Sequence, residues 1–373
     1  MTAPHNPHAT GLITVDLGQL KANWRALAGL VAPAECGAVV KADAYGTEAW
    51  KAIRALSSAG CKTFFVATAD EAASARHHGI TDSAFFVLDG LLPGAGESLL
   101  AANAIPVVSS LAEIDEWIAL GNGKRMPAAL QIETGLNRLG MAEAEIDLLA
   151  GDKARLDRLD LRLVMSHLAS ADDPADAKNE AQRATFDRLK VKLPHAMASL
   201  AASDGLMLGR SYHYDLVRPG YALYGGQAFR GGRTPVAPIV TVVAKILQVR
   251  DVQVGETVGY SGTWRAPRAS RIAIIAAGYA DGIARALSAP GGQKGGAVSI
   301  GGALAPIVGR VSMDLITVDV TDIRPEPRRG DLVTLIGPNV TIEAMGQASG
   351  TIGYEVLTRL GPRFQRRFID EGG

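Results

Sequence analysis

The sequence predicts an α/β fold, an N-terminal (β/α)8 barrel of the TIM type followed by a mostly β C-terminal domain. Two observations lead to this. Through the first two-thirds of the chain, short apolar runs alternate with helical patterns, as in βαβ units with parallel strands. After about residue 240 the apolar runs are β-branched and closely spaced. We therefore expect the barrel over residues 1–239 and the β domain over residues 240–373.

The first part of the chain contains enough strand candidates for a closed barrel. The stretch around Leu200 can supply one more strand in addition to seven apolar runs, which are residues 38–41, 64–67, 85–88, 105–108, 129–132, 161–167 and 216–218. Apolar residues at helical spacing lie between the runs, as in Leu17, Leu20, Trp24, Leu27 and Val31. A count of eight favours a closed barrel over an open sheet.

The second part has a different pattern. Residues 225–235 are rich in glycine and turn signals, and helical periodicity stops there. Glycine, proline and aspartate divide the apolar runs that follow, which are residues 240–249, 271–276, 296–300, 307–308, 315–320 and 332–336. Residues 342–345 and 354–360 predict short helices near the end.

Composition excludes several classes of protein. The 373 residues are 47% hydrophobic, enough for one large or two ordinary domains. Lys+Arg and Asp+Glu both number 38, so charge gives no reason to expect nucleic acid or a membrane surface as a partner. The start lacks the pattern of a signal peptide, and no apolar run has the length of a membrane span. Cys36 and Cys61 lack metal-ligand spacing, so we expect no metal and a cytoplasmic protein.

Lys41 is the first residue that indicates chemistry. It ends an apolar run that is typical of a buried strand, and lysine is rarely buried without a partner. A Schiff base with a carbonyl cofactor would explain an amine in such a place. Tyr45, four residues later, could reach another part of the same ligand.

Further polar residues follow other predicted strands. Arg138 comes after the run 129–132, His167 closes the run 161–167, and Arg218 closes the last one. Taken singly, each has a structural explanation as a core histidine, a surface charge or a turn residue. Together they favour an anionic, conjugated ligand, because the carboxyl ends of barrel strands form the active-site face. The turn at Gly220 and Tyr221 is placed to bind phosphate through backbone N–H groups.

Seven segments, in order, resemble the signatures of bacterial alanine racemases: AVVKADAYG, ETGLNRLG, MSHLASAD, VRPGYALYGG, AAGYADG, VGRVSMD and TIGYEVLTRL. The resemblance spans Thr14 to the C-terminus. It implies pyridoxal 5′-phosphate as cofactor, interconversion of L- and D-alanine to supply peptidoglycan, and a head-to-tail homodimer with shared active sites. It also implies that the first strand, near residues 12–16, pairs with the second domain.

The resemblance also assigns catalytic and substrate-binding residues. Lys41 would be the Schiff-base lysine and the base on the D side. Tyr279, arriving from the partner subunit, would be the base on the L side. Arg138 and the backbone N–H of Met313 would bind the substrate carboxylate.

Cofactor contacts are assigned in the same way. Arg218 would face the pyridine nitrogen. Presenting Tyr279 as a phenolate near pH 7 would cost about 4 kcal/mol, and a cationic His167 backed by Arg218 could offset much of it. The residues implied for the phosphate are Tyr45, Ser203, Gly220, Tyr221 and Tyr354.

One position departs from the pattern of some relatives. They have a lysine modified by carbon dioxide where this chain has Gln131. Glutamine cannot form a carbamate, so Arg138 must be held by another anion, with chloride as our hypothesis, or by the amide itself.

Three alternatives stay open at this point. Serine or a broader set of amino acids could be the substrate, because an apolar pocket rejects one hydroxyl by about 10²-fold at most, although a small pocket closed by Tyr279 and Tyr354 favours alanine. Decarboxylases of similar plan should lack a tyrosine at position 279. A non-catalytic pyridoxal phosphate-binding barrel would not need the second domain with Tyr279 and Met313.

Overall fold

The computed structural model describes residues 8–289 and 295–370. The chain forms two compact units, one of residues 20–237 and the other of the segment up to Gln19 together with residues from Pro238 onward. The expected boundary at 239/240 lies close to this division, and the first strand groups with the second unit. No helix among the described residues is long and apolar enough to cross a membrane.

Parallel strands follow one another around the unit of residues 20–237. Seven of them form one sheet in sequence order: β3 (Ala38–Val39), β4 (Thr63–Val66), β5 (Ala84–Val87), β6 (Ile105–Val108), β7 (Met126–Gln131), β8 (Leu159–Met165) and β9 (Met197–Ser199). The strand expected near Leu200 is β9. Sequential order with parallel pairing is the pattern that repeated βαβ units give.

The strand β10 (Leu216–Val217) closes the ring. It pairs in parallel with β2 (Glu35–Cys36), and Val39 N–H donates to the Pro219 carbonyl at 2.8 Å. On its other side, Arg218 N–H donates to the Ala201 carbonyl just beyond β9 at 2.9 Å. The predicted barrel is thereby confirmed, and Arg218 lies at the closing seam.

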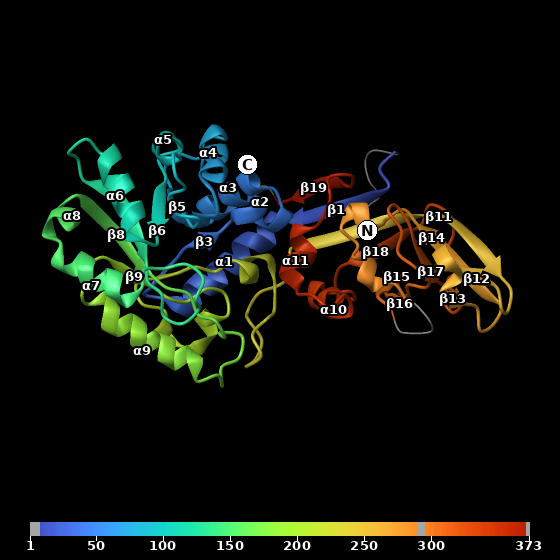
Figure 1. Cartoon of the computed structure of the whole chain (residues 1–373). Helices are drawn as coiled ribbons and strands as arrows, with labels where there is room; N and C mark the ends of the chain where they lie inside the picture. Colours follow the sequence, from blue (N-terminus) through green and yellow to red (C-terminus); the bar gives the residue numbers. More distant parts are fainter. Residues whose placement is uncertain (1–7, 290–294, 371–373) are drawn as a thin grey trace. The chain divides into compact units, whose positions relative to one another are not determined.

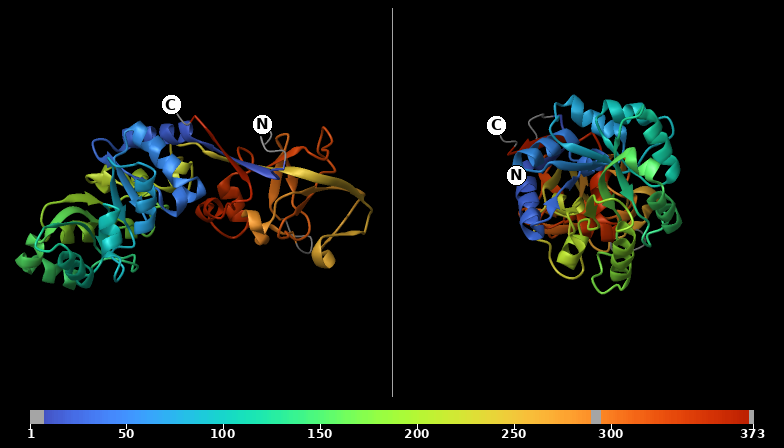
Figure 2. Two further views of the ribbon diagram at one scale, coloured as in Figure 1. Left: turned by 90° about the horizontal axis from the view of Figure 1, so that it is seen from above. Right: turned by 90° about the vertical axis from the view of Figure 1, so that its left-hand side faces the viewer.

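Helices follow the strands and lie outside them (Figures 1 and 2). They are α1 (Leu17–Val31), α3 (Ala49–Ala59), α4 (Ala69–His77), α5 (Gly96–Ala101), α6 (Leu111–Leu120), α7 (Glu143–Gly151), α8 (Lys153–Asp157) and α9 (Lys178–Lys190). Short 3-10 turns are η1 (Gly205–Leu208), η2 (Arg210–Tyr212) and η3 (Tyr221–Tyr224). The segment labelled α2 (Lys41–Gly46) has a different backbone, described below.

Two aromatic pairs on β4 and β5 lie on opposite faces of the barrel sheet. Phe64 and Phe85 stack with centroids 5.6 Å apart, and Phe65 and Phe86 stack at 5.2 Å. Successive residues of a strand point to opposite faces of the sheet. The Arg218 guanidinium lies 5.9 Å from the Phe65 ring centroid, so the second pair shares its face with Arg218.

The other unit is mostly β, as predicted. Its main sheet runs β16 (Ala303–Pro306), β15 (Ala297–Ile300), β18 (Leu332–Ile336), β11 (Val240–Val252), β1 (Gly11–Asp16), β19 (Gln365–Ile369), and β14 (Ser270–Ile275) joins β11 to β17 (Ile316–Asp319). A hairpin is formed by β12 (Thr257–Val258) and β13 (Trp264–Arg265). The helices are α10 (Ile342–Ala348) and α11 (Gly353–Thr358), with 3-10 turns η4 (Tyr260–Gly262), η5 (Tyr279–Asp281) and η6 (Arg285–Leu287).

The strand β1 explains why the start of the chain belongs to this unit. It lies inside the sheet, antiparallel to β11 and parallel to β19. Leu12, Ile13 and Val15 are at most 2% exposed. A strand that is hydrogen-bonded on both edges and buried by its apolar residues is part of the core of that sheet.

Candidate active site

Four of the predicted site residues form one electrostatic cluster at strand ends of the barrel. Lys41 comes just after β3, Arg138 lies in the loop after β7, His167 lies just beyond β8, and Arg218 follows β10 directly. The three cations all act on the imidazole of His167 and lower its pKa. These residues, separated by up to 177 positions (218 − 41), are therefore neighbours in space.

Lys41 begins a left-handed helical turn. Ala42, Asp43, Ala44 and Tyr45 have φ between 51° and 58° and ψ between 36° and 51°. Such a conformation costs L-residues roughly 1–2 kcal/mol each. A run of this kind, which includes two alanines, must be stabilised by its surroundings, and it fixes the direction in which the backbone presents Lys41.

The carboxylate of Glu71 holds the start of that turn. Its Oε1 accepts from Ala42 N–H and its Oε2 from Ala67 N–H, each at 2.7 Å. Ala67 follows β4, so one side chain ties the ends of two adjacent strands together. Farther along the turn, Asp43 Oδ1 accepts from Ala49 N–H at 2.7 Å.

The environment of Lys41 favours a neutral amine. Burial lowers the pKa of the half-buried side chain, and the Arg138 guanidinium lowers it further, whereas Asp89 and Glu71 oppose the shift. Desolvation acts in this direction because it penalises the charged form. An amine of lowered pKa is nucleophilic and basic closer to neutral pH.

Arg218 is a buried cation bonded to neutral groups. Only 3% of its surface is exposed, and its Nη1 donates to Ser199 Oγ while its Nη2 donates to the Ser166 carbonyl at 2.7 Å. Among the described residues, no carboxylate lies within ion-pair distance of it. Burial lowers its pKa to about 9, so the guanidinium stays protonated at neutral pH.

The structure corrects the expectation that His167 is cationic. Burial, followed by Arg218, Arg138 and Lys41, lowers its pKa to about 3 from an ordinary 6.5. Its Nδ1 faces Arg218 Nη2 at 3.5 Å. The imidazole is therefore neutral near pH 7, because a second cation beside Arg218 would be repelled, and the positive charge of this pair resides on Arg218.

The turn after β10 converges with Ser203 in a way that suits an anion. Ser203 Oγ accepts from Gly220 N–H at 3.0 Å and from Ala222 N–H at 3.1 Å. A Cβ on Gly220 would collide with the Tyr45 hydroxyl, so only glycine brings backbone and hydroxyl this close. Tyr221, which begins η3, is 2% exposed. Backbone N–H groups gathered with hydroxyls are typical of phosphate sites.

Gln131 supports Arg138 indirectly, by a hydrogen bond to the backbone of the loop that carries it. Its Nε2 donates to the Leu139 carbonyl at 2.8 Å, and the side chain is 6% exposed. In the part of the chain that the structure describes, no carboxylate pairs with the exposed Arg138. The amide thus anchors the residue next to Arg138, and a bound chloride stays a hypothesis.

The remaining predicted residues belong to the β unit. Tyr279 N–H donates to the Ser312 carbonyl and Ala280 N–H to the Met313 carbonyl, both at 3.0 Å. The side chains of Tyr279 and Met313 are 45% and 53% exposed. Tyr354 lies in α11 of the same unit and is half-buried. Tyr279 and Met313 are therefore neighbours within this unit.

The sequence prediction missed two supporting residues. Ser199 was not singled out, and no local pattern distinguishes it. Glu71 does have a signal, because Thr68 and Glu71 have the spacing of a capping box. Thr68 Oγ1 indeed accepts from Glu71 N–H at 3.3 Å, but the carboxylate reaches beyond the usual capping partner to Ala42.

We expect Glu71→Gln to lower both the stability of the fold and the pKa of Lys41. Glutamine has only one acceptor oxygen, so the N–H of either Ala42 or Ala67 loses its partner, which costs about 1–3 kcal/mol of unfolding free energy. The pKa of Lys41 falls further, because Glu71 raises it. Urea unfolding and the pH dependence of Lys41 acetylation, followed by mass spectrometry, measure the two effects.

Glu113→Gln is the matched control for Glu71→Gln. Glu113 also follows an N-cap residue, Ser110, by three positions, and it accepts from Ser109 N–H and Leu91 N–H at 3.2 Å, away from Lys41. The Glu113→Gln variant should lose a similar unfolding free energy and leave the pH dependence of Lys41 acetylation unchanged. Identical acetylation profiles in the two variants would contradict the role of Glu71.

The shifted pKa of His167 should appear in the acid stability of the cofactor-free protein. Unfolded, His167 binds a proton near pH 6.5, but folded only near pH 3. As pH falls from about 6.5 towards 3, proton uptake by the unfolded state therefore lowers the unfolding free energy, by up to about 1.4 kcal/mol per pH unit. Unfolding free energies of His167→Gln should fall less steeply between pH 7 and 5. Exposed His195→Gln is the control, and equal slopes for His167→Gln and wild type would refute the assignment.

Two family models match the chain. The alanine racemase N-terminal domain matches residues 15–228, and the alanine racemase C-terminal domain matches residues 239–368. An alanine racemase of Methylobacterium sp. (strain 4-46) is 47% identical over 99% of this chain and 100% of its own length. A catabolic alanine racemase of Mesorhizobium japonicum is 42% identical over 97% of this chain and 94% of its own.

Solved structures agree with the sequence relatives. Alanine racemase from Bartonella henselae, with covalently bound pyridoxal phosphate, superposes with a TM-score of 0.92 at 40% identity, over 97% of this chain and 100% of the other. The biosynthetic alanine racemase from Pseudomonas aeruginosa gives 0.88 at 31% identity, over 96% and 99%. By its two matched domains and its full-length relatives, the chain belongs to the alanine racemase family.

Proposed function

We propose that this chain interconverts L- and D-alanine with pyridoxal 5′-phosphate as its cofactor. One observation carries the proposal: an amine of lowered pKa, on a fixed left-handed turn, stands in a cluster with Arg218 at the barrel strand ends of an alanine racemase family member. When bound, the cofactor supplies a conjugated system that stabilises negative charge at the substrate Cα.

The residues of the barrel fit this cofactor. The hydroxyls of Ser203 and Tyr45, which meet at the turn of Gly220, suit the phosphate. Lys41 suits the aldehyde, because its lowered pKa makes the amine easier to deprotonate. Arg218 would hold the pyridine nitrogen by donating a hydrogen bond. We assign Tyr221 and Tyr354 to the phosphate as well, on the resemblance.

Two bases would exchange the Cα proton on opposite faces of the substrate. The neutral amine of Lys41 would remove or return it on the D side. Tyr279 would do so on the L side, and its exposed side chain is available to a site outside its own unit. One base on each face makes it unnecessary for the substrate to turn over.

Arg218 would favour racemisation over other reactions of the cofactor. A guanidinium that keeps its proton at neutral pH leaves the pyridine nitrogen unprotonated. By keeping the pyridine nitrogen of the bound cofactor unprotonated, Arg218 would make the ring a weaker electron sink, and a shorter lifetime of negative charge at Cα would suppress transamination. His167, being neutral, would tune this site through hydrogen bonding rather than charge.

Substrate binding and assembly complete the proposal. Arg138 and the Met313 N–H would bind the carboxylate of a small amino acid. A homodimer would bring Tyr279 and Met313 of one subunit to Lys41 of the other. A cytoplasmic location and a role in supplying D-alanine for peptidoglycan stay predictions from the sequence.

The decisive experiment is incubation with L-alanine in deuterated water. We expect deuterium at Cα and loss of optical rotation, because each proton exchanges with solvent during inversion. Lys41→Ala should abolish both and the borohydride-reducible chromophore. Loss of carbon dioxide would indicate a decarboxylase, and faster turnover of L-serine would indicate a different substrate. Absence of exchange in the wild type would indicate a non-catalytic carrier of the cofactor.

Arg218→Glu tests the choice of reaction. A carboxylate partner would let the pyridine nitrogen carry a proton, so we expect cofactor retention with a higher ratio of transamination to racemisation. Pyruvate formation and the change in optical rotation measure that ratio. The explanation fails if mutant and wild type partition equally.

A further inference from the structure

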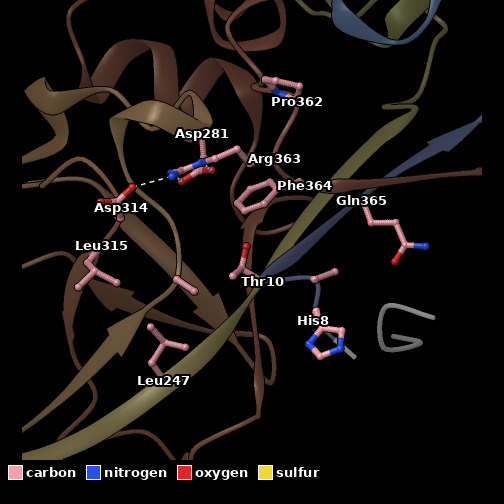
Figure 3. Close-up of a pocket in the computed structure, with 12 residues that line it drawn as sticks. His8, Thr10, Leu247, Asp281, Asp314, Leu315, Pro362, Arg363, Phe364 and Gln365 are labelled. Carbon is pink, nitrogen blue, oxygen red and sulfur yellow. Dashed lines mark hydrogen bonds and ion pairs between the residues drawn. The ribbon is translucent and has the colours of Figure 1, made fainter. Parts of the chain in front are cut away.

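Arg363 lies between the two loops that carry Tyr279 and Met313 (Figure 3). Its Nε and Nη2 donate to the two carboxylate oxygens of Asp281 at 2.8 and 2.7 Å, and its Nη1 donates to Asp314 Oδ1 at 2.6 Å. Asp281 ends the turn η5 that Tyr279 begins, and Asp314 follows Met313. One guanidinium therefore joins both loops.

The backbones of these loops are already in close contact. In addition to the two bonds from Tyr279 and Ala280, Gly278 leaves no room for a side chain, since a Cβ there would collide with the Met313 carbonyl. The backbone contact between the two loops is confined to this short strip, and the guanidinium of Arg363 adds a second set of contacts between them.

The two carboxylates differ in burial, which separates their roles. The Asp281 side chain is 3% exposed, and its Oδ2 also accepts from Gly278 N–H at 2.8 Å. A buried carboxylate of this kind depends on its cation. The Asp314 side chain is 59% exposed, and an exposed ion pair contributes little to stability. The Asp314 contact is therefore better explained by orientation than by stability.

Close packing does not hold Arg363 in place. Its side chain is 44% exposed and borders a cavity of about 600 Å³ that Phe364, Gln365 and His8 also line. The guanidinium therefore owes its direction to the two carboxylates. Arg363 also lies on the segment that follows α11, the helix of Tyr354, and on this segment Gly361 N–H donates to the Asp281 carbonyl at 3.2 Å.

We propose that Arg363 is a positioning residue that fixes Tyr279 and the backbone of Met313 relative to each other. The inference rests on the proposed function, in which Tyr279 moves the Cα proton and the Met313 N–H binds the carboxylate. A planar guanidinium can bond both oxygens of Asp281 and reach Asp314 at once. The point-like ammonium of lysine cannot do so.

The test uses the cofactor-loaded enzyme and D-alanine deuterated at Cα, in ordinary water. Two rates are measured. Washout of deuterium from D-alanine without inversion needs only Lys41, whereas formation of L-alanine also needs Tyr279. We expect Arg363→Gln to lower racemisation by about 10²-fold, as misplacement by about 1 Å can. Washout should fall less, so that the ratio of washout to racemisation rises at least about tenfold.

Two further variants separate the two contacts. Asp314→Asn leaves the ion pair between Arg363 and Asp281 intact. We therefore expect a higher KM for alanine and a ratio of washout to racemisation near that of wild type. Arg363→Lys retains the charge without the planar geometry, and its ratio should lie between wild type and Arg363→Gln. Arg359→Gln is the control, because this exposed arginine of the same segment pairs with Glu355 and should change neither rate.

The outcomes distinguish this inference from the proposed function. A wild type that does not racemise alanine refutes the proposed function before any variant is compared. Equal loss of both rates in Arg363→Gln means that the residue only stabilises the fold, and it overturns the positioning role. Should Arg363→Gln fail to fold, unchanged values in both Arg363→Lys and Asp314→Asn overturn it instead.

Discussion

The site in the barrel depends on a backbone conformation that the chain does not favour. The left-handed turn after Lys41 costs roughly 1–2 kcal/mol for each non-glycine residue. The helix that follows the neighbouring strand offsets this strain, because its Glu71 carboxylate accepts from the N–H groups of both Ala42 and Ala67. The direction of Lys41 thus depends on the pairing of β3 with β4, whose ends this carboxylate joins.

That amine lies in an environment with an excess of positive charge. Arg138 and Arg218 act with Lys41 on His167, and the network around Arg218 consists of a hydroxyl, carbonyls and an aromatic face. Buried charge without a counter-ion is unfavourable. An anionic ligand relieves this cost and gains binding energy, which explains physically why neutral donors and cations gather where a phosphate-bearing cofactor is proposed.

The sequence could predict which polar residues follow the strands, because that is a local pattern. It could not predict properties that arise from contacts between residues far apart in the chain. Lys41 and Arg218 were singled out because polar residues after apolar runs are conspicuous, and the resemblance implied that β1 pairs with the second domain. The charge of His167 was predicted wrongly, since a pKa reflects the summed field of Arg218, Arg138 and Lys41. The reach of Glu71 to Ala42 was also hidden, because the two residues are 29 positions apart.

The proposed division of the chemistry between two units would explain why each has its own rigid support. A base that must act within about 0.5 Å of its proper position needs a locked backbone beneath it. In the barrel Glu71 locks the turn of Lys41, and in the β unit Asp281 with Arg363 locks the turn of Tyr279. Both devices are carboxylates that accept from the backbone beside the reactive residue. Each half of the site is therefore preorganised within its own unit, independently of the other.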